Sequence, residues 1–130
     1  ERAARHYYAD ADGAVGAALV RALGADGAAA APLMRFLDYD ACGALPPHVD
    51  LARTFSGRRS THTFLLYLND CAGGETALLE TLRGACLAAV APRRGRLLVF
   101  PHDRPHEGRP TGGKKLLLRG ELYLPPSACA

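Results

Sequence analysis

The chain has 130 residues, of which 48% are hydrophobic and 22% are charged, and its formal net charge is +3. This is enough apolar material for one domain with a buried core and too little charge for a disordered chain. The weak positive charge, without a long lysine or arginine tract, argues against a nucleic-acid-binding protein, and no apolar run of about 18 residues could span a membrane. No signal-peptide pattern is present either, so we expect an intracellular protein.

The first element in chain order is a helix. Apolar residues recur at helical spacing in Asp12–Leu23, and Gly24 follows where a C-terminal helix glycine is usual. Asp10 or Asp12 could cap the start of this helix. The Ala- and Gly-rich stretch that follows predicts a connector or a long surface loop. Residues 1–32 are therefore expected to form a helical flank and a connector.

The rest of the chain is typical of β-strands joined by turns, because short apolar runs alternate with Gly, Pro, Asp and Asn. Two short strands are expected to flank Pro46 and Pro47. Seven longer strands are expected at Leu33–Tyr39, Thr61–Asn69, Glu75–Glu80, Ala85–Val90, Arg96–Phe100, Arg104–Arg109 and Lys114–Leu124. Since no second strong helix separates them, they favour a mainly β barrel or jelly roll over a parallel α/β fold. We predict one domain, residues 1–130, with a jelly-roll core at 33–124.

The four cysteines are isolated from one another in sequence: Cys42, Cys71, Cys86 and Cys129. Since no CxxC pattern occurs, neither a zinc knuckle nor a thioredoxin-type site is expected. A chain of this length does not need disulfides to build a core. We therefore expect most of the cysteines to be free, buried, small hydrophobic residues.

The most informative polar pair is His48 and Asp50, in the run Pro46-Pro47-His48-Val49-Asp50. On a β-strand, residues i and i+2 share a face, so a nitrogen and an oxygen ligand would lie side by side. A histidine from a distant strand would complete a two-histidine, one-carboxylate triad, which suits non-haem Fe(II) that activates O₂. The candidate is His106, with His102 as its competitor. Zinc remains an alternative metal, and an ordinary turn remains the alternative for the isolated pair.

The last expected strand carries two cations. Lys115, Leu117 and Arg119 alternate along it and share one face. A cation on the inner face of an apolar strand is costly unless it meets an anion. The run is apolar in both registers, so the pattern leaves two arrangements open. Either the two cations point inward, or Leu116 and Leu118 fill the core.

Five blocks of the sequence, in order, resemble those of the Fe(II)/2-oxoglutarate-dependent dioxygenases, and within them the prolyl 4-hydroxylase-like branch. The resemblance runs from residue 33 to residue 123 and is far more specific than a lone HxD pair. The blocks are Arg35–Tyr39 with Pro47–Asp50, Ser60–Asp70 with the Gly73-Gly74-Glu75-Thr76 turn, Pro92–His102, His106–Gly108 and Gly113–Tyr123. By this resemblance, His48, Asp50 and His106 would bind Fe(II), and His102 would be a neighbour and not a ligand.

The resemblance also implies a site for 2-oxoglutarate as co-substrate. Lys115 lies nine residues after His106 and takes the place of the family's Lys or Arg that pairs with the distal carboxylate. Tyr67 would add a hydroxyl to that carboxylate. Arg119, on the same face as Lys115, is a weaker candidate for the anchor, and Tyr39 is a candidate pocket residue.

The implied fold is a double-stranded β-helix of two antiparallel sheets with the helix packed outside. The implied reaction consumes O₂ and 2-oxoglutarate, releases succinate and CO₂, and hydroxylates a C–H bond. The resemblance favours a prolyl residue of a peptide or protein as substrate, with ascorbate as a candidate accessory cofactor. The stretch Leu51–Arg59 resembles the family's mobile loop after HxD. The alternatives are a non-catalytic jelly-roll module with a degenerate site and a zinc-binding, cupin-like protein.

Overall fold

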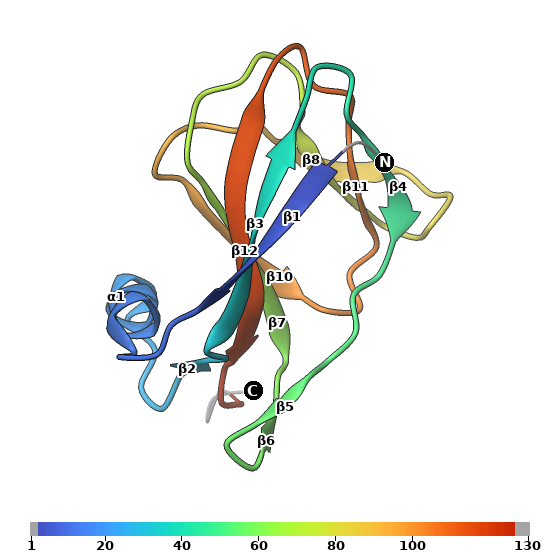
Figure 1. Cartoon of the computed structure of the whole chain (residues 1–130). Coiled ribbons are helices and arrows are strands. Elements are labelled where there is room, and N and C mark those ends of the chain that lie inside the picture. Colours follow the sequence, from blue (N-terminus) through green and yellow to red (C-terminus); the bar gives the residue numbers. More distant parts are fainter. Residues whose placement is uncertain (1–2, 127–130) are drawn as a thin grey trace.

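Two large antiparallel sheets, a two-stranded hairpin and one helix make up the computed structural model, which describes residues 3–126 (Figure 1). The major sheet has the order β1 (Ala3–Ala9), β3 (Leu33–Tyr39), β12 (Lys115–Tyr123), β7 (His62–Tyr67) and β10 (Leu97–Pro101), with β2 (Ala29–Ala30) beside β12. The minor sheet has the order β4 (Leu45–His48), β11 (His106–Gly108), β8 (Thr76–Leu79) and β9 (Cys86–Val90). The remaining elements are helix α1 (Ala14–Leu23) and a hairpin of β5 (Thr54–Phe55) and β6 (Arg58–Arg59). The predicted mainly β jelly roll with an N-terminal helix is confirmed.

Helix α1 begins two residues later than predicted, at Ala14, and ends at Leu23 as expected. Asp10 and Asp12 both accept hydrogen bonds from backbone N–H groups of its first turn. Gly24 ends the helix in the left-handed conformation, with a φ of 63°, which glycine adopts without steric cost. Within residues 3–126, no helix is long and apolar enough to cross a membrane.

All seven longer strands that the sequence predicts are present, with ends that differ by at most two residues. The expectation near the prolines is wrong, because one strand, β4, runs through Pro46 and Pro47 where two flanking strands were expected. β4 lies at the edge of the minor sheet and pairs only with β11. An edge strand tolerates proline, since the missing N–H can face away from the ladder.

Strand β1 was not predicted from the sequence. Its residues are alanines and side chains with polar groups, and most are exposed, so no apolar alternation marks them. It becomes a strand by pairing along its whole length with β3, from Ala3 opposite Tyr39 to Ala9 opposite Leu33. β2 also lies within the predicted connector, and the β5–β6 hairpin lies within the predicted loop after the HxD pair. These elements are stabilised by partner strands that lie far away in the sequence or show little apolar alternation, so the local sequence does not mark them.

The major sheet has a core on each face. On its inner face, a cluster lies against residues of the minor sheet: Leu37, Tyr39, Leu65, Tyr67, Phe100 and Leu117. On its outer face, Leu19 of α1 packs with Met34, Phe64, Leu118 and Leu122. The apolar outer positions of β12 therefore lie beneath the helix. This settles the register that the sequence left open, because Lys115 shares the inner face with Leu117 and is only 2% exposed.

The cysteine prediction is partly wrong. Cys42, Cys71 and Cys86 are all free, but only Cys71 is buried. Cys42 lies in the turn between β3 and β4, and Cys86 begins the edge strand β9, so neither position faces a core. Cys129 lies outside the described residues.

Gly120, on the outer face of β12, cannot accommodate a side chain. A Cβ atom added there would lie 2.5 Å from Phe64 Cε2 and 2.8 Å from Phe64 Cζ. We expect Gly120→Ala to lower the free energy of unfolding by about 1–3 kcal/mol, as overpacked cores usually do. Gly113→Ala is the matched control, because nothing lies within 4 Å of the added Cβ. Urea unfolding measures both, and equal midpoints for the two variants would contradict this packing.

Candidate metal centre

The two candidate histidine ligands face each other across the minor sheet. His48 ends β4 and pairs directly with His106 at the start of β11, and their ring centroids lie 4.1 Å apart. Asp50 lies two residues beyond the end of β4, so the strand predicted over the HxD pair includes His48 but not Asp50. Its backbone N–H donates to the carbonyl oxygen of His102 at 2.9 Å, which holds this segment beside the end of β10.

The donor atoms of His48, Asp50 and His106 converge within 4.8 Å of one another. The two Nε2 atoms lie 3.4 and 3.5 Å from the Asp50 carboxylate oxygens. Each Nδ1 lies 2.9 Å from a backbone carbonyl oxygen, that of Pro46 or Arg104. In the neutral form that binds a metal, a proton on Nδ1 donates to that carbonyl and the Nε2 lone pair is directed at the shared point, as in metal-ligating histidines. The set fits a metal with two nitrogen ligands and one carboxylate.

Charge and burial set the protonation of this cluster. Burial raises the pKa of Asp50, but the hydrogen bond with His48 and the positive charge of Arg119 outweigh it and hold that pKa well below its usual range. The hydrogen bond with Asp50 raises the pKa of His48, while burial lowers the pKa of His106. The cluster therefore offers an ionised carboxylate and a buried imidazole that resists protonation, which are the forms that bind metals.

A hydrogen-bonded row of side chains positions Asp50. Thr63 Oγ1 donates to Asp50 Oδ2 at 2.7 Å and lies 2.8 Å from His102 Nδ1. Because the single hydroxyl proton of Thr63 goes to the carboxylate, His102 Nδ1 is the donor in the second bond. His102 Nε2 then accepts from Ser60 Oγ at 2.7 Å. Both ring nitrogens of His102 are thus occupied, and the convergent set contains His106 and not His102.

Lys115 is a buried cation near this centre. Its Nζ donates to the carbonyl oxygen of Gly74 at 3.0 Å and lies 4.4 Å from the centroid of the Tyr39 ring. Burial lowers its pKa. Among residues 3–126, Lys115 forms no ion pair, and a buried charge without a partner is costly. The ammonium has a carbonyl oxygen and an aromatic ring as neighbours and is available to pair with an anion from outside the chain.

A narrow cavity of about 40 Å³ joins the two sites, since its lining includes His48, His106, Thr76 and Lys115. Tyr67 is fully buried on the same face of the major sheet, opposite Leu117. Its hydroxyl lies 2.5 Å from Thr76 Oγ1 at the cavity wall. Burial raises the pKa of Tyr67, so it carries a hydrogen-bonding hydroxyl at neutral pH.

Arg119 lies on the metal side of this cavity. One guanidinium nitrogen is 3.0 Å from Asp50 Oδ1, and the other is 3.6 Å from Glu121. These contacts link it to a carboxylate of the metal centre. Glu121 and two arginines that contact it, Arg35 and Arg53, were not predicted as site residues from the sequence. The inward alternation of β3 and β12 could have indicated Arg35 and Glu121, but nothing in the sequence indicated Arg5 on β1.

The comparison with family models decides the family of this chain. The model of the 2OG-Fe(II) oxygenase superfamily matches residues 34–120, which is most of the sequence. The chain belongs to this superfamily. The matched segment contains His48, Asp50 and His106 together with Lys115. Among curated proteins, no sequence matches this chain.

Solved structures of prolyl hydroxylases share the fold of this oxygenase. A Pseudomonas putida prolyl-4-hydroxylase is 24% identical with a TM-score of 0.64, over 94% of this chain and 72% of that one. A viral collagen prolyl hydroxylase from Paramecium Bursaria Chlorella virus-1, in a 2OG complex, is 14% identical with a TM-score of 0.68, over 96% of this chain and 81% of that one. A Trichoplax adhaerens prolyl hydroxylase, in complex with a hypoxia inducible factor peptide fragment, is 16% identical with a TM-score of 0.66, over 94% of this chain and 64% of that one.

Proposed function

We propose that this oxygenase hydroxylates a prolyl residue of a peptide or protein, using Fe(II), O₂ and 2-oxoglutarate and releasing succinate and CO₂. The observation that carries the proposal is the pairing of a convergent His48, Asp50 and His106 set with the buried cation Lys115 across one narrow cavity. The similarity in fold to prolyl hydroxylases supports the choice of a prolyl substrate. One of those enzymes is bound to a peptide fragment, which supports a peptide or protein substrate here.

In this proposal, His48, Asp50 and His106 hold Fe(II), which supplies the activation of O₂ when bound. Thr63 and Arg119 fix the orientation of the Asp50 carboxylate through the hydrogen bond and the ion pair described above. The backbone carbonyls that accept from the two Nδ1 atoms fix both imidazole rings. The chain therefore holds its three ligands in position before the metal binds.

Lys115 and Tyr67 bind the distal carboxylate of 2-oxoglutarate in this proposal. The ammonium of Lys115 supplies the counter-charge, and the Tyr67 hydroxyl lies beside Thr76 at the wall of the same cavity. Leucine side chains line the space between these groups and the metal centre and keep water out: Leu37, Leu45, Leu65 and Leu117. Ascorbate as an accessory reductant stays a prediction, which the dependence of turnover on added ascorbate would test.

The test is a turnover assay with the protein, Fe(II), 2-oxoglutarate and proline-containing peptides. We expect metal-dependent succinate release and a peptide that gains one oxygen atom on a prolyl residue. The His106→Ala variant is the inactive control. Succinate release without modification of any prolyl peptide would refute the substrate class alone. Tight zinc binding without any 2-oxoglutarate affinity would instead support the cupin-like alternative.

The pH dependence of co-substrate use should follow Lys115. Its pKa is lowered by burial, and only the charged form pairs with a carboxylate. Raising the pH through this lowered pKa should therefore reduce kcat/KM for 2-oxoglutarate at a pH where an ordinary lysine is still charged. Lys115→Arg is the matched control, because arginine stays charged across this range. If the alkaline limb is the same in both proteins, another group is responsible for it.

A further inference from the structure

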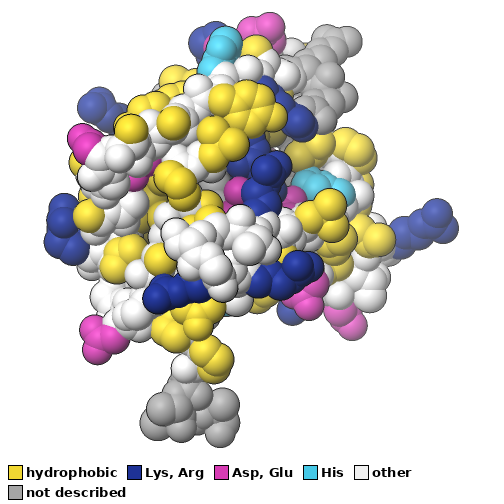
Figure 2. Space-filling model, turned by 60° about the horizontal axis from the view of Figure 1, so that its bottom comes forward, with side chains coloured by type: hydrophobic (Ala, Val, Ile, Leu, Met, Phe, Trp, Pro, Cys, Tyr) yellow, Lys and Arg dark blue, Asp and Glu magenta, His cyan; other side chains and the backbone are white. Residues whose placement is uncertain are grey.

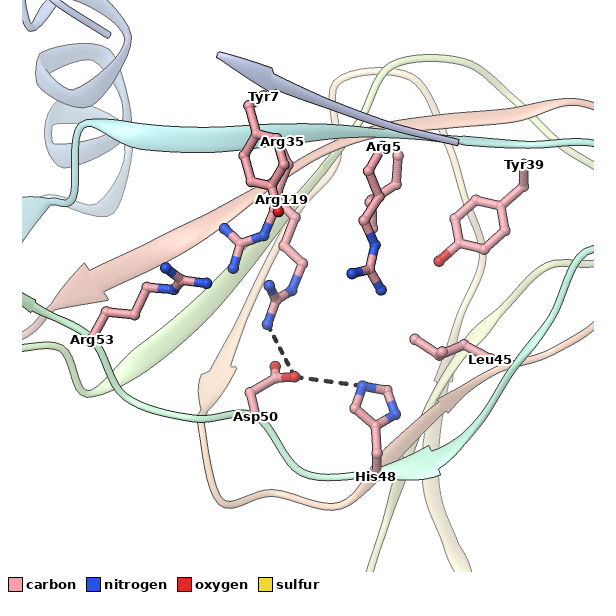
Figure 3. Close-up of a pocket in the computed structure, with 10 residues that line it drawn as sticks. Arg5, Tyr7, Arg35, Tyr39, Leu45, His48, Asp50, Arg53 and Arg119 are labelled. Carbon is pink, nitrogen blue, oxygen red and sulfur yellow. Dashed lines mark ion pairs between the residues drawn. The ribbon is translucent and has the colours of Figure 1, made fainter. Parts of the chain in front are cut away.

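A second, larger pocket opens beside the metal centre and is lined by four arginines. Its volume is about 210 Å³, and Arg5 from β1, Arg35 from β3, Arg119 from β12 and Arg53 from the segment after the HxD pair contribute to its wall. Figure 3 shows Arg5, Arg35 and Arg119 extending from one layer of strands toward His48 and Asp50 on the opposite side. The pocket thus combines two metal-centre residues with a cluster of guanidinium groups.

Among residues 3–126, the arginines that line this pocket outnumber the acidic side chains that pair with them. Glu121 accepts from Arg35 through both oxygens, at 3.4 and 3.0 Å, and also lies 3.4 Å from Arg53 and 3.6 Å from Arg119. Among residues 3–126, Asp50 is the other acid in these ion pairs, and it contacts Arg119 at 3.0 Å. Even without Arg5, three guanidinium groups share two carboxylates, and one of these is a proposed metal ligand. Each guanidinium carries five N–H donors, so donors and positive charge remain for a further anion.

The arginine pocket and the narrow cavity are different compartments that meet at the metal centre. His48 and Arg119 line both of them. Lys115 lines only the narrow cavity, whereas Arg5 and Arg35 line only the larger pocket. If 2-oxoglutarate extends from the metal centre with its distal carboxylate in the compartment with Lys115, the compartment with the arginines is the one left for the molecule that is hydroxylated.

We propose that the arginine pocket binds an acidic side chain, Asp or Glu, of a peptide substrate close to the residue that is hydroxylated. This inference rests on the proposed function and adds the substrate's charge to it. Glu121 already engages Arg35 through both oxygens, in the fork geometry by which arginine recognises carboxylates. The donors for a further carboxylate therefore come from the other guanidinium groups, such as those of Arg53 and Arg119. A volume of about 210 Å³ is below the ~300–1,000 Å³ of pockets for drug-sized ligands. This pocket therefore suits one or two side chains of a longer peptide.

The molecular surface agrees with this assignment. Figure 2 shows a face on which Lys or Arg side chains lie at the centre, beside acidic side chains and a histidine. The side chain of Arg53 is 53% exposed, so an approaching peptide can reach it. The side chain of Arg119 is 18% exposed and adjoins the metal centre, so the cluster extends from the surface to the proposed reacting position.

The experiment compares peptides that contain a single proline and differ only by Glu or Gln at one flanking position, with that position scanned on both sides. Binding to the protein loaded with Fe(II) and 2-oxoglutarate is measured by fluorescence anisotropy without O₂, and hydroxylation is measured separately by mass spectrometry. The protein variants are Arg5→Gln and Arg53→Gln. Arg83→Gln, which removes the same charge at an exposed position outside the pocket, is the matched control.

We expect at least one Glu peptide to bind about tenfold or more tightly than its Gln partner. Both pocket variants and added salt should reduce this difference, and Arg83→Gln should leave it unchanged. Equal binding of Glu and Gln peptides at every position, or no binding of any, would overturn the acidic-side-chain assignment. An equal loss in Arg83→Gln would also overturn it, because the effect would then be one of net charge. Charge-dependent binding without prolyl hydroxylation would support the pocket and refute the prolyl substrate.

Discussion

His48→Ala, Asp50→Ala and His106→Ala should each abolish 2-oxoglutarate turnover. Each change removes one of the three proposed Fe(II) ligands, whose donor atoms lie within 4.8 Å of one another. Asp50→Ala has a further effect, because it leaves Arg119 without its 3.0 Å partner beside the site. Succinate release and Fe(II) binding, measured on the same preparations, give the result. Near-UV circular dichroism shows whether each variant keeps its tertiary structure.

His102→Ala is the informative comparison for this series. The side chain of His102 reaches Asp50 only through Thr63, which donates to the carboxylate. The bond from the Asp50 backbone N–H to the His102 carbonyl oxygen remains in an alanine variant, so in our assignment the His102 ring positions a ligand without being one. Loss of such an indirect contact usually costs about 10–100-fold in metal affinity or activity. We therefore expect His102→Ala to keep measurable turnover that added Fe(II) partly restores. An inactive His102→Ala together with an active His106→Ala would exchange the two histidine assignments.

Lys115→Ala should produce the largest defect in co-substrate binding. Removing one partner of a buried ion pair costs about 3–5 kcal/mol, which corresponds to about 10²–10⁴-fold in affinity. The Michaelis constant for 2-oxoglutarate should rise by this order, while Fe(II) binding stays intact. Decarboxylation in the absence of a peptide should fall in parallel, because the defect lies in co-substrate binding and not in recognition of the hydroxylated substrate.

Two further variants test whether Lys115 is the main anchor for the distal carboxylate of 2-oxoglutarate. Tyr67→Phe removes one hydrogen bond to a charged group, worth about 1.5–3 kcal/mol, so its Michaelis constant should rise less than that of Lys115→Ala. Arg119→Ala should mainly weaken Fe(II) binding, since its guanidinium pairs with Asp50 and Glu121. If Arg119→Ala loses 2-oxoglutarate affinity while Lys115→Ala keeps it, the anchor lies four residues further along β12.

Local patterns account for much that was predicted from the sequence. The seven longer strands were predictable because alternating or apolar runs between turn residues reflect side-chain burial directly. Helix α1 was predictable from its period and from Gly24 at its end. His48, Asp50 and His106 were recognised from ordered motifs, and the structure brings them together because the register of β4 and β11 places His48 opposite His106.

What the sequence by itself determined was therefore the class of fold and the chemistry of the proposed ligand set. The tertiary structure alone decided that Lys115 and Arg119 point inward, because the run around them is apolar in both registers and only the packing of α1 on the outer face selects one. It also decided that β1 is a strand, since its mostly exposed residues gain their order from pairing with β3. The arginine pocket also exists only in the tertiary structure, because its residues come from separate strands. Arg5, Arg35 and Arg119 are far apart in the chain, and only the strand order β1-β3-β12 places them on one wall beside Asp50.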